Sequence, residues 1–305
     1  LTGDALGNIL IGGGGADQLD GQGGEDTIFG EAGADTLLGS AGGDLLNGGA
    51  GIDTVDYTAS LSAVVVDLQL GTGFGGLAEA DTLTNIENVL GSHFNDRISG
   101  TISVNVLSGF DGDDTLEGGA SGDTLDGGVG NDVASYASSD AAIIIDLGAG
   151  TASGGHASGD VLIAIEGIEG SLLDDVLTGD AGSNDLWGLA GDDTLNGAAG
   201  DDNLRGGAGQ DELTGGEGAD SLDGGSGTDT ASYVNSAQGV NVDLTLQSGT
   251  GGSAEGDVLT GIENLRGSSH ADLLRGDTSA NVLDGGAGDD TLIGLAGADT
   301  LIGGL

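Results

Sequence analysis

Aspartate recurs in this chain at a fixed interval of nine residues. From Gly12 the sequence reads GGGGADQLD, GQGGEDTIF and GEAGADTLL, so each aspartate follows a glycine by five positions. With that glycine as position 1, the pattern is G-G-x-G-x-D-x-U-x, where U is a large apolar residue. Regularly placed carboxylates beside glycine turns with accessible carbonyl oxygens favour the binding of hard cations. Their repetition argues against acid–base pairs of a single active site.

The nonapeptide frame is kept throughout the repeats. Of 22 nonapeptides, all have Gly at position 1 and an apolar residue at position 8. Position 6 is Asp in eighteen of them and Asn in the other four, Asn8, Asn105, Asn184 and Asn281.

Three spacers of 34 residues divide these repeats into four blocks, and each spacer opens on a tyrosine, Tyr57, Tyr136 or Tyr233. We therefore expect one continuous solenoid of seven segments: block 1 (1–56), spacer 1 (57–90), block 2 (91–135), spacer 2 (136–169), block 3 (170–232), spacer 3 (233–266) and block 4 (267–305). Because the sequence begins and ends inside a repeat, we expect it to be part of a longer array.

Two nonapeptides are predicted to make one turn of the solenoid. The distance from Tyr57 to Tyr136 is 79 residues and that from Tyr136 to Tyr233 is 97, a difference of 18. An insertion of two repeats keeps the phase of a coil only if two repeats complete a turn.

Positions 7 to 9 are predicted to form short strands, whose side chains alternate between the two faces. Position 8 then points inward, and stacked coils bury a ladder of leucines between two parallel sheets. The sequence therefore predicts an all-β fold, a β-solenoid of the parallel β-roll type.

In such a stack, equivalent turns lie about 4.8 Å apart, so Asp17 should face Asp35, and Asp35 should face Asp53. Like charges at this distance repel by about 1 kcal/mol per pair even in water. A hard divalent ion with six to eight oxygen ligands relieves that repulsion, and calcium suits the turns better than magnesium, which resists dehydration. Zinc is disfavoured because the three histidines are scattered and cysteine is absent.

The candidate calcium ligands are the position-6 aspartates of the strict repeats, against the alternative that these residues only close Asx-turns. They are Asp17, Asp26, Asp35, Asp44, Asp53, Asp114, Asp123, Asp132, Asp193, Asp202, Asp211, Asp220, Asp229, Asp290 and Asp299.

The first two repeats after each spacer depart from the pattern. The first has Phe94, Leu173 or His270 in place of glycine at position 4, and the second has Asn at position 6. We expect these turns to be transitions into calcium-free coils.

The spacers contain β-rich runs such as Val64-Val65-Val66. We expect each spacer to continue the roll as coils without calcium, with its tyrosine covering the core near the junction. A separate small β element docked on the roll is the second interpretation. For Asp67, Asp81, Glu87 and their counterparts we favour a solvated or local structural role over calcium binding.

Composition limits the partners of the chain. The formal net charge is −47 with only four Lys and Arg, which argues against nucleic acid and anionic membranes. No apolar run approaches the ~18 residues of a transmembrane helix, so membrane insertion is not expected. Self-association and a cell-surface partner are left open. The sequence has neither an HExxH motif nor a G-x-S-x-G elbow, and we expect no enzyme activity.

The nonapeptides are identified as repeats of the RTX, or hemolysin-type calcium-binding, β-roll family. The spacer motif DYTASLSAVVVDL…GG…IENVLGS also resembles segments of large secreted RTX proteins. The resemblance implies a right-handed parallel β-roll, multiple Ca²⁺ ions, export by a type I system and folding in extracellular calcium. The family includes toxins, proteases, lipases, epimerases, adhesins and surface-layer proteins.

Three functions follow as hypotheses. The first is an extracellular structural protein, such as an adhesin, surface layer or filament, which the long array and recurring spacers favour. The second is a calcium-dependent folding and export module of a larger secreted enzyme or toxin. The third, glycan binding, is disfavoured by a single tryptophan, Trp187, and few basic residues.

Overall fold

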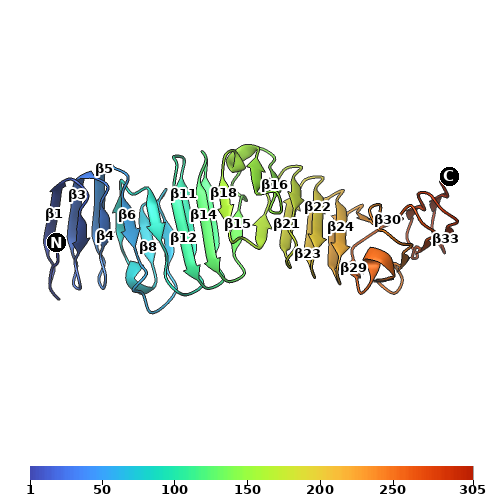
Figure 1. Cartoon of the computed structure of the whole chain (residues 1–305), viewed down its shortest axis with the longest axis horizontal. Helices are drawn as coiled ribbons and strands as arrows, with labels where there is room; N and C mark the ends of the chain where they lie inside the picture. The colour runs from blue at the N-terminus through green and yellow to red at the C-terminus, as the bar shows by residue number, and fades with distance from the viewer. Residues whose placement is uncertain (305) are drawn as a thin grey trace. The chain divides into compact units, whose positions relative to one another are not determined.

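The computed structural model describes residues 1–304, and Leu305, the last residue of block 4, lies outside the described residues. The chain divides into two compact units (Figure 1). Unit 1 comprises Leu1–Tyr136 with Gly155–Ile165, and unit 2 comprises Ala137–Gly154 with the residues from Glu166 onward. Spacer 2 thus contributes residues to both units, which are described separately below.

The strands form where the nonapeptide alternates polar and apolar residues. In Thr36–Leu38 the middle residue, Leu37, is fully buried while its neighbours are partly exposed. The same pattern recurs at Leu19, Leu116 and Leu204, whose side chains are also fully buried. Position 8 therefore supplies the core, as the period of two in a strand requires.

Unit 1 consists of two sheets whose strands lie side by side (Figure 1). The first sheet runs β1 (Ile9–Gly14), β3 (Thr27–Gly33), β5 (Leu45–Gly51), β9 (Thr82–Thr84), β8 (Thr72–Phe74), β7 (Val65–Asp67), β11 (Arg97–Thr101), β13 (Thr115–Gly119) and β15 (Val133–Ser135). The second, seven-stranded sheet runs β2 (Gln18–Asp20), β4 (Thr36–Leu38), β6 (Thr54–Asp56), β10 (Asn88–Leu90), β12 (Val106–Asp111), β14 (Thr124–Val129) and β18 (Val161–Ile163).

Unit 2 repeats this plan. Its first sheet runs β19 (Gly167–Glu169), β21 (Asp185–Ala190), β23 (Asn203–Gly209), β25 (Ser221–Gly227), β29 (Val258–Thr260), β28 (Ser248–Thr250), β27 (Asn241–Asp243), β31 (Leu273–Arg275) and β33 (Thr291–Ile293). The second, nine-stranded sheet runs β17 (Thr151–Ser153), β16 (Ile144–Asp146), β20 (Val176–Thr178), β22 (Thr194–Ala199), β24 (Glu212–Glu217), β26 (Thr230–Ser232), β30 (Asn264–Arg266), β32 (Val282–Asp284) and β34 (Thr300–Ile302).

The strand register confirms that two nonapeptides make one coil. Within the blocks, parallel neighbours are offset by 18 residues: Ile28 pairs with Leu46, and Leu204 pairs with Leu222. The pairing extends past the core triplet into the turns, where Ala32 lies opposite Ala50. Because the turns stack in register, equivalent residues of every turn form columns along each unit.

The spacers depart in part from the expected coils. In spacer 1, β9 pairs with β5 and β10 pairs with β6, so these two strands complete a coil as predicted. β7 also continues the roll, because it pairs parallel with β11, but the prediction is wrong for β8, which runs antiparallel to both β7 and β9. Strand β7 thus lies beside the later strand β11, and β8 lies between β7 and β9, antiparallel to both, in the same sheet. Spacer 3 has the same arrangement with β27, β28 and β29.

Helical structure in residues 1–304 is limited to three short 3₁₀ turns, one in each spacer: η1 (Gly76–Ala78), η2 (Gly155–Ala157) and η3 (Gly252–Ala254). None of the helices in the described part of the chain is long and apolar enough to cross a membrane. The spacer tyrosines are buried, as predicted: Tyr57 is fully buried, and Tyr136 and Tyr233 are 1% exposed.

Candidate metal centre

The position-6 aspartates form ladders that run from coil to coil. The backbone N–H of Asp17 donates to Oδ1 of Asp35, and that of Asp35 donates to Oδ1 of Asp53, both at 2.8 Å. The same bond joins Asp193 to Asp211 at 2.9 Å. It continues from Asp211 to Asp229 and from Asp202 to Asp220. The predicted columns of aspartates are therefore present in the structure.

The second carboxylate oxygen of these residues has a different environment. Oδ2 is buried and has no hydrogen-bond partner in Asp17, Asp26, Asp35, Asp44, Asp53, Asp114, Asp123, Asp193, Asp202, Asp211, Asp220, Asp229 and Asp290. Buried polar atoms are nearly always hydrogen-bonded, and an unpaired charged oxygen is costly to bury. A row of such atoms indicates that a ligand from outside the chain is required.

The remaining two candidates continue the same ladders. Asp132 is fully buried, and its Oδ1 accepts a hydrogen bond from the N–H of Asp114. Asp299 lies in the last described coil and is half-buried, and its Oδ1 accepts from the N–H of Asn281.

Glycine at position 1 leaves room beside the unpaired oxygen. A Cβ on Gly12 would lie 2.9 Å from Oδ2 of Asp17 and 2.8 Å from the carbonyl oxygen of Gly30. Both distances are too short for a carbon atom, which explains why position 1 is always glycine. They also show that a carboxylate oxygen and a carbonyl oxygen from adjacent coils converge on the same place.

The backbone at position 2 is left-handed in all fifteen strict repeats, which we call open turns. Its φ is 101° at Gly13, but it is also 78° at Phe110 and 73° at Leu189. For a residue with a Cβ this conformation costs about 1–2 kcal/mol. The non-glycine cases are Gln22, Glu31, Ser40, Phe110, Leu189, Ala198 and Leu295. Strain held so regularly marks a functional constraint on the turn.

Electrostatics point the same way. Burial raises the pKa of Asp114, Asp123 and Asp193 from an ordinary value of 3.8 to about 7. Burial also raises the pKa of Asp202 and Asp220 to about 6. Proximity of like charges adds to the effect, as for Asp193 beside Asp175 and Asp211. The ladder therefore resists ionisation unless a cation enters.

The Asn-type turns are satisfied without an ion. Oδ1 of Asn184 accepts from the N–H of Asp180 at 2.8 Å, and Nδ2 donates to the carbonyl oxygen of Glu166 at 3.1 Å. Asn105 bonds in the same way to Thr101 and Glu87. These side chains hold the turn by hydrogen bonds alone.

Sequence reasoning did not foresee that spacer residues extend the ladders. Asp81 accepts the N–H of Asp44 at 2.8 Å, and Glu87 accepts the N–H of Asp53 at 2.8 Å. The signal was present, because Gly76 precedes Asp81 by five residues and Leu83 follows it, as in a nonapeptide. Asp67 instead caps a local turn through the N–H of Leu70. The contact of Asp67 is the local structural role that we favoured, whereas Asp81 and Glu87 accept from residues 37 and 34 positions away and belong to the ladders.

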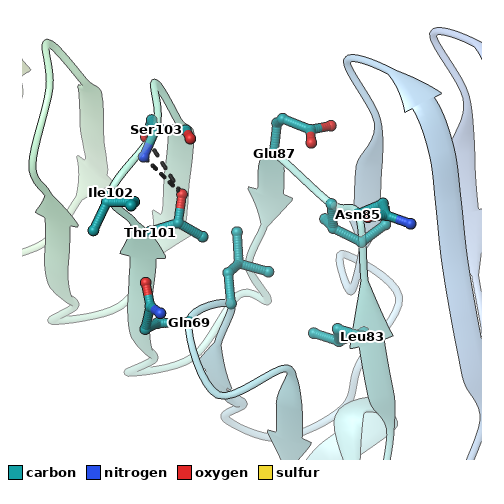
Figure 2. Close-up of a pocket in the computed structure, with 9 residues that line it drawn as sticks. Gln69, Leu83, Asn85, Glu87, Thr101, Ile102 and Ser103 are labelled. Carbon is teal, nitrogen blue, oxygen red and sulfur yellow. Dashed lines mark hydrogen bonds between the residues drawn. The ribbon is translucent and has the colours of Figure 1, made fainter.

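A cavity of about 280 Å³ opens beside Glu87, where spacer 1 meets block 2 (Figure 2). Figure 2 shows Glu87 across from Thr101 and Ser103, and the N–H of Ser103 donates to Oγ1 of Thr101 at 3.0 Å. Leu83 and Ile102 add apolar surface. Glu87 is the only carboxylate in its lining, so the cavity does not reproduce the paired carboxylates of the ladders.

The donor set fits a hard cation. Successive coils offer carboxylate and glycine carbonyl oxygens, which calcium accepts in flexible arrangements. Within residues 1–304 no cluster of three or more His, Cys, Asp or Glu side chains is placed to hold a metal ion. Ligands in the open turns would therefore be aspartates of adjacent coils together with backbone carbonyls.

A family model described as the RTX calcium-binding nonapeptide repeat (4 copies) matches the chain in seven places, of which the first six form three overlapping pairs: 2–37, 20–55, 90–125, 99–134, 169–204, 196–231 and 266–301. The matched residues make up more than half of the chain. The chain belongs to the RTX calcium-binding repeat family. No curated protein matches it in sequence. As an RTX β-roll, the chain binds Ca²⁺ at multiple sites, and we assign those sites to the open turns as a prediction.

Substitution of Asp211 by alanine should remove about two calcium ions per chain, because this aspartate lies between Asp193 and Asp229 in its ladder. Substitution of Asn184 by alanine should cost about 1–3 kcal/mol of stability by leaving its partners unpaired, with no loss of calcium. Native mass spectrometry in calcium counts the ions. Equal calcium content in the two variants would contradict the pairing of adjacent coils.

The calcium-free chain should be more structured in acid than at neutral pH. Because burial raises the folded-state pKa above the unfolded value of 3.8, these carboxyls stabilise the fold fully below that value. That stabilisation is lost as the pH rises through about 7. With calcium the trend should reverse, since the ion binds the ionised form. Far-UV circular dichroism between about pH 4 and pH 8, with and without chelator, tests this, and identical profiles would refute it.

Proposed function

We propose that this chain is an extracellular structural segment whose β-roll folds and becomes rigid when calcium binds. The row of buried, unpartnered Oδ2 atoms in both units is the observation that carries the proposal. Each atom lies in a turn that stacks on the equivalent turn of the adjacent coil, so an ion there holds adjacent coils together. Folding and ion binding are then one process.

The calcium concentration links this chemistry to location. Turns built from carbonyl oxygens and few carboxylates bind calcium at ~0.1–1 mM, the range of extracellular modules. At lower calcium the ladder carboxylates repel one another and burial opposes their ionisation. The chain would therefore remain unfolded during export and fold outside the cell.

Three observations favour a structural role over catalysis. The carboxylates that might act as acid–base pairs are repeated along every block and do not form one distinct pair. The 22 nonapeptides all form the same kind of half-coil. The net charge of −47 is typical of a solvated surface and disfavours a nucleic-acid partner. We infer that it belongs to an adhesin, surface layer or filament and is not itself an enzyme.

Chelation should convert the isolated chain into an expanded, disordered state. Calcium at ~0.1–1 mM should restore the β-structure, whereas magnesium at the same concentration should not, because it dehydrates reluctantly. Circular dichroism and small-angle X-ray scattering report the two states. An unchanged spectrum after complete chelation would overturn calcium-coupled folding.

The location is tested on intact cells that produce the protein. We expect an external protease to degrade the chain after a chelator wash and to spare it in calcium, because only the unfolded chain exposes cleavable backbone. A cytoplasmic protein serves as the control for cell integrity. Complete protection in both conditions, with cleavage after lysis in chelator, would place the chain inside the cell.

A further inference from the structure

Seven turns keep the nonapeptide frame but have a different backbone; six of them are the first two turns after each spacer and one is the first turn of the chain, and we call them closed turns. They begin at Gly3, Gly91, Gly100, Gly170, Gly179, Gly267 and Gly276. Position 2 is left-handed in every open turn and in none of these seven. Position 4 follows the same division except at Gly130 of one open turn: φ is 125° at Gly191 of an open turn, whereas Leu173 of a closed turn is not left-handed.

In three closed turns a serine at position 2 satisfies the whole carboxylate. The N–H of Ser171 donates to Oδ2 of Asp175 at 2.5 Å, and its Oγ donates to Oδ1 at 2.9 Å. The N–H of Leu173 donates back to Oγ of Ser171 at 3.1 Å, which completes the closure. Ser92 with Asp96, and Ser268 with Asp272, make the same contacts.

At the other edge of each spacer a tyrosine does the same for the last aspartate of a ladder. Oδ1 of Asp81 accepts the N–H of Asp44, as in an open turn, and Oδ2 accepts the hydroxyl of Tyr57 at 2.9 Å. Tyr233 bonds to Oδ2 of Asp257 at 3.0 Å. The tyrosine hydroxyl thus occupies, at Asp81, the position next to Oδ2 that is left without a partner at Asp44.

We propose that the serine and tyrosine hydroxyls beside each spacer take the place of calcium on the aspartate ladder. The spacers are then ion-free segments that divide the calcium array into separate blocks, and the backbone conformation at position 2 distinguishes the turns that take an ion from those that do not. This inference rests on the proposed calcium binding and adds the residues that exclude the ion. Ion entry at Asp175 would require breaking both serine hydrogen bonds and turning position 2 to a left-handed φ.

A reciprocal exchange between two neighbouring turns of one ladder tests the proposal. Ser171→Gly with Leu173→Gly changes GSLLDD to GGLGDD and should open the turn, adding one calcium ion per chain. Leu189→Ser with Gly191→Leu changes GLAGDD to GSALDD and should close the next turn, removing one ion. Ser171→Thr is the matched control, since threonine keeps the hydroxyl, as Thr101 does at position 2 of another closed turn, and should leave the ion count unchanged.

Native mass spectrometry and calorimetric titration count the ions in the wild type and each variant, and circular dichroism in calcium verifies folding. If the wild type binds no calcium, the proposed function itself fails. If the wild type binds calcium but a folded exchange variant has the same count, the inference is overturned. The two exchanges are independent, so if one variant does not fold, the count of the other decides.

Discussion

The fold depends on a buried carboxylate oxygen for which the protein provides no partner. In a ladder aspartate such as Asp35, Oδ1 accepts a backbone N–H from the adjacent coil, and Oδ2 has no partner and is left for an ion. Each coil otherwise buries only two position-8 side chains among eighteen residues. Glycine-rich turns lose more conformational entropy on folding than other segments. Because the core is this small, calcium binding and folding occur together.

The same residues serve the fold and the ion site. Glycine at position 1 is required because a side chain would collide with the aspartate and the next coil. The left-handed position 2 keeps its N–H away from Oδ2, which the contrast with Ser171 and Asp175 makes visible. The open turns therefore lose stability through the unpaired carboxylate oxygen, and those without glycine at position 2 also through backbone strain, and calcium restores that stability.

Much of the architecture follows from sequence because it is periodic. The offset of two repeats between spacers predicts the 18-residue register, and the apolar position 8 predicts the core. The return strand Thr72–Phe74 could not be predicted, because its antiparallel pairing depends on where Val65–Asp67 docks. Nor could the bond from Tyr57 to Asp81, which joins residues 24 apart in the sequence. Three of the closed turns did carry a signal, a serine at position 2, but Ser40 occupies that position in an open turn, so the meaning of the serine depends on the backbone angle.

The spacers show how such an array grows without losing its phase. β9 is offset from β5 by 37 residues and β10 from β6 by 34, yet both place their middle residues, Leu83 and Val89, in the buried row. The residues that exceed one coil form β7 and β8, and β11 pairs with β13 at the regular offset of 18 residues. Blocks 2 and 3, which each lie between two spacers, have five and seven repeats, so their lengths differ by an even number of repeats. The 79- and 97-residue units therefore differ by one full coil, which keeps the phase of the solenoid.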